Sequence, residues 1–403
     1  MKTDIIPGMD LQPTITQAFR SRFGGPPASI VSAPGRVNII GEHTDYNDGL
    51  VLPMAIDRAV WIALRPRRDR QVIVHSLDFE ETAKFSLDNL HKGKGWPEYI
   101  KGVAWAMQVE RLKDSPRGSA RGVEGWEGVV TGDVPKGAGL SSSAALELAA
   151  ARAFATVSDL EWEPVKIARL CLKAENEWVG LNCGIMDQMI SAAAQAGHAL
   201  FLDCRSLNFE QIPLPGGLSV AVLDTATRRG LVDSDYNERR DQCEAAARFF
   251  GVRALRDVDM QAFEARASQL DPLTRRRARH VIYENERVSQ AVAAMRRGDV
   301  KTLGGLLDAS HASLRDDFEV SSPALDSMVE IARQAVGCVG ARMTGAGFGG
   351  CAVALVRAER VQEFSIHVAQ EYTRQIGLTP NVYICQAAAG ASLFLLDALE
   401  RLC

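Results

Sequence analysis

Residues 35–49, GRVNIIGEHTDYNDG, gather polar side chains of several kinds between apolar stretches of the chain. The closing letters NDG are typical of a tight turn, but a turn does not require Arg36, Glu42, His43 or Asp45. Carboxylates accept hydrogen bonds from hydroxyl groups, and arginine binds negative charge. A metal site is the alternative, because acids and a histidine cluster, yet no second histidine lies at a ligand spacing. The segment therefore favours recognition of ligand hydroxyl groups.

A second candidate is the segment PKGAGLSSSAALELAAARAFA, which starts at Pro135 and passes abruptly from glycine and serine to strong helix formers. Gly137 and Gly139 let the backbone approach an anion, the three serines offer hydroxyl groups, and the start of a helix favours negative charge. The loop is not a Walker A motif, because Lys136 precedes its glycines and no Gly-Lys-Ser/Thr closes it. A flexible turn with a serine helix cap is the alternative interpretation. A nucleotide phosphate is the ligand that suits the loop.

Asp187 lies at an otherwise apolar helix start, behind Gly184, in the segment EWVGLNCGIMDQM. An acid in the first turn of a helix is stabilised by the helix dipole, which is a purely structural explanation. A general base is the alternative, since catalytic acids stand in such surroundings. Both interpretations remain open at this point.

A third glycine-rich loop, MTGAGFGG at residues 343–350, precedes the apolar strand-like run CAVALV. Its alternative interpretation is a tight turn with positive backbone angles. The dinucleotide-binding fingerprint follows its strand, whereas this loop comes before one. A dinucleotide-dependent dehydrogenase is therefore disfavoured.

Length and composition indicate an ordinary globular chain that acts on small ligands. The 403 residues are 46% hydrophobic and carry a formal net charge of -4, which gives no overall field for nucleic acid or anionic membrane. The basic run RRRAR at 275–279 fits a solvated helix face. No two of the eight cysteines form a Cys-x-x-Cys pair, and no signal peptide or long apolar run is visible. We expect a cytoplasmic protein that binds neither nucleic acid nor membrane.

The hydrophobic periodicity predicts a mixture of strands and helices arranged as an α+β protein with two lobes. Strands are predicted at 29–33, 59–64, 71–76, 127–134, 199–204, 219–224, 351–356 and 381–386. Helices are predicted at 99–112, 141–156, 164–179, 185–196, 234–250, 273–297, 324–336 and 361–376.

Taken together, these segments resemble the galactokinases of the GHMP small-molecule kinase superfamily. GRVNIIGEHTDYNDG is similar to the sugar signature of that family, PKGAGLSSSAA to its ATP loop, and MTGAGFGG to its third conserved loop, and the phrases CGIMDQ, FLDCRSL and RRDQCE add to the likeness. The resemblance implies a two-lobed GHMP kinase fold, with mixed sheets and helices and an active site in the cleft between lobes. It places the sugar signature and ATP loop in an N-terminal lobe, 1–205, and the third loop in a C-terminal lobe, 206–403, with an approximate boundary.

The implied reaction is ATP-dependent phosphorylation of the anomeric C1 hydroxyl of α-D-galactose, which yields galactose 1-phosphate and ADP. By the same match, Asp187 is the catalytic acid and Arg36 stands beside it and offsets charge on the transferred phosphoryl group. The residues that the resemblance assigns to the sugar are Glu42, His43, Asp45, Gly184 and Tyr236.

The resemblance also assigns residues to ATP and to Mg²⁺. Trp96, with Tyr99 beside it, is similar to the aromatic residues on the adenine side, although the sequence alone favours core packing for both. The metal residues are Ser142 and Glu175, with Glu177 as a nearby alternative to the latter. The remaining ATP residues are Pro135, Gly137, Gly139, Leu140, Ser141, Ser142, Ser143, Gly345 and Gly347.

Two other functions remain possible from the sequence. A kinase of the same family for N-acetylgalactosamine or arabinose is one, although Ile185 and Met186 resemble the galactose version, which lacks room for an acetamido group. A regulatory sensor that binds galactose and ATP is the other, although the intact GLSSSAA and Asp187 favour turnover. For the oligomeric state we expect a monomer or a weak dimer.

Overall fold

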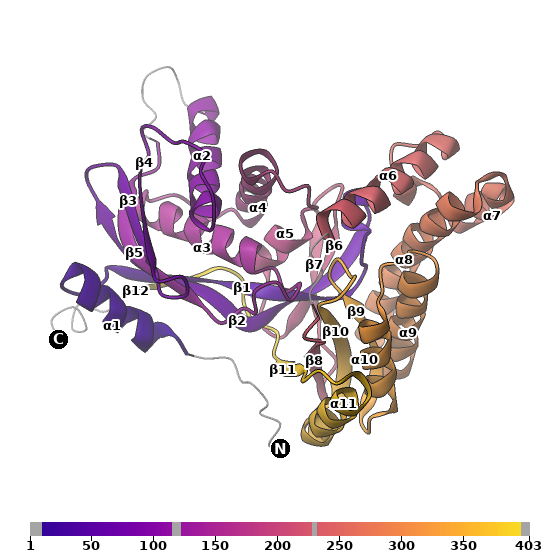
Figure 1. Ribbon diagram of the computed structural model, residues 1–403. Helices are drawn as coiled ribbons and strands as arrows, with labels where there is room; N and C mark the ends of the chain where they lie inside the picture. Colours follow the sequence, from indigo (N-terminus) through magenta and orange to yellow (C-terminus); the bar gives the residue numbers. More distant parts are fainter. Residues whose placement is uncertain (1–9, 115–121, 228–231, 396–403) are drawn as a thin grey trace.

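The computed structural model describes residues 10–114, 122–227 and 232–395 of the 403-residue chain, and within them two sheets and their helices form two adjoining parts (Figure 1). The larger sheet has the spatial order β12 (Ser392–Leu395), β1 (Ser29–Ile40), β2 (Leu50–Arg67), β5 (Gly125–Gly132), β3 (Gln71–Ser76) and β4 (Glu81–Ser86). Beyond this path, β6 (His198–Asp203) pairs with the start of β2, and β7 (Phe209–Pro213) pairs with β6. The pairs are antiparallel except β3 with β5, which is parallel.

Successive residues of each strand point to opposite sides of the larger sheet, so apolar side chains lie on both of its faces. Helices cover both faces. Ile30 of β1 and Val129 of β5 contact Ile15 and Phe19 of α1 (Gln12–Phe23), below the sheet in Figure 1. Their neighbours, such as Val31, belong to the main core on the opposite face. The helices on that face are α2 (Pro97–Asp114), α3 (Ser142–Val157), α4 (Pro164–Lys173) and α5 (Met186–Ala193).

The smaller sheet is entirely antiparallel and has the order β11 (Asn381–Cys385), β8 (Leu218–Asp224), β10 (Cys351–Arg357) and β9 (Cys338–Thr344). Alternation again splits its side chains: Leu223 and Ala352 join a helical core, whereas Val222 and Val353 join the core of the larger sheet. The helices of this part are α6 (Val232–Phe250), α7 (Met260–Arg266), α8 (Pro272–Arg297), α9 (Val300–Asp316), α10 (Pro323–Gln334) and α11 (Val361–Ile376). The single-turn helices are η1 (Asp45–Asn47), η3 (Leu255–Asp257), η4 (Ala267–Gln269) and η5 (Ala358–Arg360). The two parts therefore share apolar core.

The predicted α+β class is confirmed, and most predicted elements are present with shifted ends. The predicted helix 164–179 is different: α4 ends at Lys173, and the chain continues as a wider π-helical turn, η2 (Ala174–Val179). The helices and strands that were not predicted from the sequence are α1, α7, α9, β4, β7, β9 and β12. In the described part of the chain, no helix combines the length and apolar composition that crossing a bilayer requires.

The course of the chain modifies the two-lobe division at 205/206. β7, at Phe209–Pro213, pairs with β6, and β12, at Ser392–Leu395, pairs with β1 of the larger sheet. Both strands lie within 206–403 but belong to the first sheet, because β1 and β6 offer them backbone partners. The division into two lobes of unbroken sequence stays a prediction, with these two strands as exceptions.

A buried carboxylate on α8 fastens the two parts of the molecule together. Glu284 Oε1 accepts a hydrogen bond from the Gly41 backbone N–H at 3.0 Å and from Ser310 at 2.6 Å, while Oε2 pairs with Arg287 at 2.6 Å. Burial alone would raise the pKa of Glu284, but Arg287, His280 and Arg342 outweigh it and lower the pKa to about 2. The charged form of Glu284 therefore stabilises the end of β1 against α8.

Replacing this carboxylate should destabilise the fold in a pH-dependent way. Glu284→Gln leaves Arg287 without its buried counter-charge, so we expect a loss of about 3–5 kcal/mol in unfolding free energy at pH 7. Because the pKa of Glu284 is about 2 in the folded state against 4.5 for the free group, its stabilisation is present above pH 4.5 and is lost as pH falls toward 2. Urea denaturation at pH 7 and pH 4 measures both effects.

The matched control is Glu286→Gln on the exposed side of the same helix, for which we expect a change within about 0.5 kcal/mol. Equal stability of the two variants, or a loss for Glu284→Gln that does not shrink in acid, would contradict the assigned role.

Candidate active site

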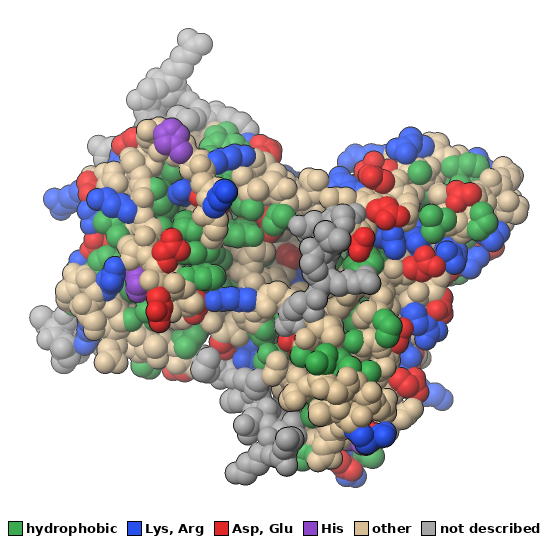
Figure 2. Space-filling model, in the orientation of Figure 1, with side chains coloured by type: hydrophobic (Ala, Val, Ile, Leu, Met, Phe, Trp, Pro, Cys, Tyr) green, Lys and Arg blue, Asp and Glu red, His purple; other side chains and the backbone are tan. Residues whose placement is uncertain are grey.

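A pocket of about 460 Å³ lies between the two parts of the molecule, which is hollowed on that side (Figure 2). It brings together most of the predicted residues from distant segments. The predicted residues that line it are Arg36, Glu42, His43, Asp45, Gly137, Gly139, Leu140, Ser141, Ser142, Ser143, Glu175, Gly184, Asp187, Tyr236 and Gly345. Trp96 lines an adjoining pocket, whereas Pro135 and Gly347 line neither of the two.

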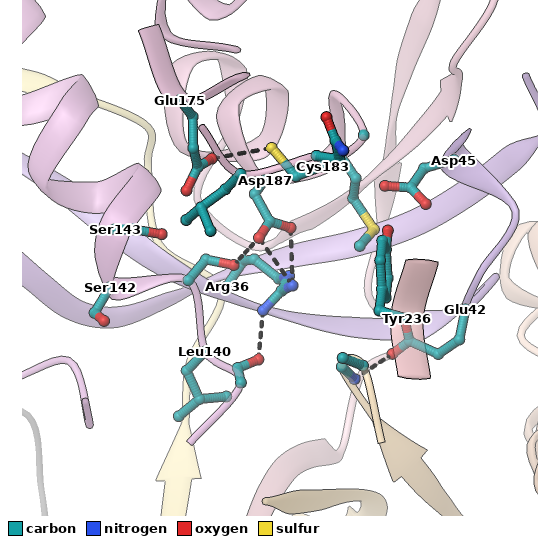
Figure 3. Close-up of a pocket in the computed structure, with 18 of the residues that line it drawn as sticks. Arg36, Glu42, Asp45, Leu140, Ser142, Ser143, Glu175, Cys183, Asp187 and Tyr236 are labelled. Carbon is teal, nitrogen blue, oxygen red and sulfur yellow. Dashed lines mark hydrogen bonds and ion pairs between the residues drawn. The ribbon is translucent and has the colours of Figure 1, made fainter. Parts of the chain in front are cut away.

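An ion pair between Arg36 and Asp187 occupies the middle of this pocket (Figure 3). The two Asp187 oxygens lie 2.8 and 3.0 Å from Arg36 Nη2, and Arg36 Nη1 donates to the Gly139 carbonyl at 2.5 Å. The Ser141 hydroxyl also donates to Asp187. The guanidinium thus joins the carboxylate to the serine loop, and the carboxylate is fixed by two donors.

Local backbone features aim these groups into the pocket. The pairing of β1 with β2 shifts register between Pro34 and Arg36, and such a bulge re-aims the side chain next to it. A Cβ on Gly35 would lie 2.7 Å from the Leu140 carbonyl oxygen, so only glycine lets the serine loop pack this closely on β1. The Arg36 backbone N–H donates to that same carbonyl at 3.1 Å. Asp187 itself lies in the first turn of α5.

Asp45 and Gly184 face one another on one side of the ion pair. A Cβ on Gly184 would fall 2.0 Å from Asp45 Oδ2, so the absence of a side chain at Gly184 makes room for the carboxyl. Burial, and then the charge of nearby Asp187, raises the pKa of Asp45 to about 7. Asp45 therefore exchanges a proton near neutral pH.

His43 and two tyrosines form the wall beside Asp45. His43 has a positive φ of 61°, and its Nδ1 lies 3.0 Å from the Tyr46 hydroxyl. Its ring centroid lies 5.6 Å from that of Tyr236 and 4.8 Å from that of Phe318. Burial lowers the pKa of His43 to about 3, so the ring is neutral at pH 7.

Glu42 faces the pocket and also holds the glycine-rich loop at residues 343–350 beside the pocket. Its Oε1 accepts hydrogen bonds from the Thr344 hydroxyl at 2.8 Å and the Gly345 N–H at 2.7 Å, and lies 3.4 Å from Arg342. One oxygen is thus committed to β9 and the loop after it. This role was not predicted, because Thr344 and Arg342 are far from Glu42 in the sequence.

Glu175 projects from the π-helical turn toward the serine loop on the other side of the ion pair. It is 5% exposed, and its Oε2 accepts hydrogen bonds from Gln188 at 2.6 Å and from the Cys183 thiol at 3.1 Å. Burial raises the pKa of Glu175. Glu177 is exposed and lies 3.9 Å from Lys173, so of the two glutamates Glu175 is the one at the pocket.

These oxygen donors match the preference of Mg²⁺ in part. Ser142, Ser143 and Glu175 supply only hard oxygen ligands, and one carboxylate with nucleotide phosphates and water is a usual environment for that ion. Among the described residues, no group of three or more His, Cys, Asp or Glu side chains is arranged to hold a metal without other ligands. The residues fit a metal that arrives with a phosphorylated ligand.

The adjoining pocket, of about 210 Å³, is mainly apolar and opens beside the serine loop. Trp96 and Phe79 lie nearly parallel there, with centroids 6.1 Å apart and an angle of 4°. Phe79 is 52% exposed, and Tyr99 lines the same pocket. Lys136 Nζ lies 4.3 Å from the Phe79 ring centroid and 3.4 Å from Asp78. A flat aromatic ligand suits this space.

Three family models match separate segments of this chain. Family models described as "Galactokinase galactose-binding signature", "GHMP kinases N terminal domain" and "GHMP kinases C terminal" match residues 17–66, 98–195 and 291–366. The galactokinase of Roseiflexus sp. (strain RS-1) is 45% identical over 382 residues, which are 93% of this chain and 95% of that protein.

Two solved structures have folds similar to that of this chain. The crystal structure of Lactococcus lactis galactokinase complexed with galactose superposes with a TM-score of 0.89 at 34% identity, covering 95% of this chain and 100% of that one. Methanococcus jannaschii mevalonate kinase, at 18% identity, superposes with a TM-score of 0.64 over 89% of this chain and 98% of that one. The second likeness concerns the fold alone.

The close approach of Asp45 to Gly184 gives a test of the site's geometry. Gly184→Ala forces the buried Asp45 carboxyl to move, so we expect a loss of about 1–3 kcal/mol in unfolding free energy. Gly305→Ala on α9, where a Cβ meets nothing within 4 Å, should instead be neutral or stabilise by up to about 1 kcal/mol. Urea denaturation compares the two variants, and unchanged stability of Gly184→Ala would refute this packing.

Proposed function

This chain belongs to the galactokinase family of GHMP kinases, and we propose here which of its side chains carry out the reaction of that family. Its activity is the ATP-dependent phosphorylation of galactose at the anomeric C1 hydroxyl, which yields galactose 1-phosphate and ADP. The observation that carries our assignment is the position of the Arg36–Asp187 pair, between a group of hydroxyl-binding residues and a glycine-serine loop (Figure 3).

Asp187 acts on the hydroxyl that attacks the γ-phosphorus. Its carboxylate is held by Arg36 and Ser141, so it can accept the proton of the C1 hydroxyl in one fixed direction. Transition states for phosphoryl transfer are loose, so orienting the hydroxyl contributes alongside removing its proton. Arg36 offsets negative charge on the transferred group, and its bond to Gly139 keeps it beside the phosphates.

The sugar lies on the side of Asp45, His43 and Tyr236. The Asp45 carboxyl, when ionised, accepts hydrogen bonds from sugar hydroxyls, and Glu42 has its second oxygen free of the glycine loop for the same purpose. Neutral His43 adds a polar ring edge without placing another positive charge in the pocket. Gly184 and Tyr236 supply the backbone and the aromatic wall.

ATP lies on the side of the serine loop. Gly137 and Gly139 have φ of 66° and 75°, which lets the loop curve around phosphate oxygens, and α3 presents its N-terminus to them. The adenine ring occupies the aromatic pocket beside Trp96 and Phe79. The remaining loop residues assigned to the nucleotide are Pro135, Leu140, Ser141, Ser142, Ser143, Gly345 and Gly347.

We assign Glu175, with Ser142, to Mg²⁺, which neutralises charge on the β- and γ-phosphates when bound. Glu175 is supported by its burial and by its position across the serine loop. Ser142 and Ser143 both line the pocket with Glu175, and Ser142 is the serine that we assign to the metal.

The rival sugars are not favoured. Ile185 and Met186, which follow Gly184 in the sequence, are 6% and 5% exposed, and Met186 lines the pocket. We take these two bulky side chains to leave little room for an acetamido group. We expect the protein to act in the cytoplasm, where its seven described cysteines, all free, would stay reduced, and as a monomer or a weak dimer.

The decisive experiment is an ADP-release assay with ATP and Mg²⁺ over galactose, N-acetylgalactosamine and arabinose. We expect kcat/KM to be highest for galactose, with each rival lower by roughly 10–100-fold or more, because missing or clashing polar contacts weaken transition-state binding. Asp187→Asn, purified in parallel, controls for contaminating kinases and should release almost no ADP. A higher kcat/KM for another sugar, or no turnover with any of them, would contradict this assignment.

A further inference from the structure

Behind Glu175 lies a buried polar chain that the reaction described above does not use. Gln188 Nε2 donates to Glu175 Oε2 at 2.6 Å and lies 3.3 Å from Glu147 Oε2. Gln188 and Glu147 are fully buried, and Glu175 is 5% exposed. Each of the three residues comes from a different element: α3, the π-helical turn and α5.

Burying these three polar side chains lowers the stability of the fold, because two of their oxygen atoms have no hydrogen-bond partner. Two carboxyl groups share one amide donor, and Glu147 Oε1 and Gln188 Oε1 have no hydrogen-bond partner. Buried polar atoms without partners cost about 1–3 kcal/mol each. Apolar side chains at Gln188 and Glu147 would satisfy the core better, so stability alone does not account for these residues.

The geometry around Glu175 suggests the purpose. Gln188 and the Cys183 thiol both bind the same oxygen, Oε2, from the protein side. Figure 3 shows the other oxygen of Glu175 pointing away from Cys183, on the side of Ser143. The two donors therefore set which carboxylate oxygen faces the serine loop and the phosphates.

Gln188 also follows Asp187 directly on α5. The helix turn that aims Asp187 at the sugar hydroxyl therefore fixes the amide that aims Glu175. Glu147, in turn, lies on α3, whose N-terminus carries Ser142 and Ser143. The hydrogen-bonded series Glu175–Gln188–Glu147 thus connects α5, which carries Asp187, to α3, which follows the serine loop.

We propose that Gln188 is a positioning residue for Glu175: it binds Oε2 and so directs Oε1 to the metal, while Glu147 limits the rotation of its amide. This rests on the proposed role of Glu175 as a metal ligand. A residue that hydrogen-bonds to a metal ligand fixes the orientation of that ligand. Its mutation typically lowers metal affinity or activity by about 10–100-fold.

The test measures metal binding directly, with Mn²⁺ as the probe. Titration of the protein with Mn²⁺ in the presence of ADP, followed by electron paramagnetic resonance, gives the affinity for Gln188→Met, Glu175→Gln and the double variant. We expect Gln188→Met to weaken Mn²⁺ binding by about 10-fold or more. The double variant should bind no more weakly than Glu175→Gln, because Gln188 acts through Glu175.

Steady-state kinetics separate positioning from general damage. For Gln188→Met we expect kcat to fall about 10-fold and the Mg²⁺ concentration for half-maximal rate to rise, with KM for galactose nearly unchanged. Gln108→Met is the control: this glutamine on α2 also bonds inside the protein, to Leu87 and Arg70, but lies outside both pockets. It should lose stability without any change in Mn²⁺ affinity.

If Gln188→Met unfolds, Gln188→Asn keeps the amide but is too short to reach Glu175, and the same loss of Mn²⁺ affinity is expected. Wild-type Mn²⁺ affinity in a folded Gln188 variant, or losses that multiply in the double variant, would overturn the proposal. Wild-type affinity in Glu175→Gln would instead remove the metal role of Glu175 on which it rests.

Discussion

The site depends on one buried cation, Arg36, and on the partners that its charge requires. Its side chain is only 8% exposed, and a charge in that position is stable only if it is paired and hydrogen-bonded. The partners come from two other segments: Asp187 from the start of α5 and the Gly139 carbonyl from the serine loop. Pairing this one guanidinium therefore places Asp187, which we propose acts on the sugar hydroxyl, against the glycine-serine loop that we propose binds phosphate.

Glu42 and Glu284 hold the two parts of the molecule together through buried hydrogen bonds. Glu42 reaches the third glycine loop through Gly345 and Thr344, and Glu284 reaches the backbone of Gly41 at the end of β1. Both carboxylates are buried and are balanced by Arg342 or Arg287. Residues 35–49 are thus held from both sides by buried contacts, so the distance between the proposed sugar and phosphate sites is set by the core.

Most residues that line the pocket could be predicted from the sequence because each motif is short and local. Residues 35–49, the serine loop and Asp187 were identified from residue types and from the resemblance to a family, and the structure gathers them in one pocket. What the sequence could not give are relations between distant positions. Nothing local indicates that β12 pairs with β1, that Glu42 binds Thr344, or that the helix beginning at Pro164 widens at Ala174 and so brings Glu175 to the pocket. Gln188 was likewise missed, since its partners lie on α3 and on the π-helical turn.

We infer that Arg36 and Asp187 act as one unit, and a double-mutant cycle on the rate of phosphoryl transfer tests this most directly. Single-turnover rates would be measured by quenched flow, at saturating ATP, Mg²⁺ and galactose, for Arg36→Met, Asp187→Asn and the double variant. Each single variant should be slower by at least about 100-fold, and the double variant should be no slower than the slower of the two. Losses that multiply in the double variant, or a near-normal rate in either single variant, would contradict the claim.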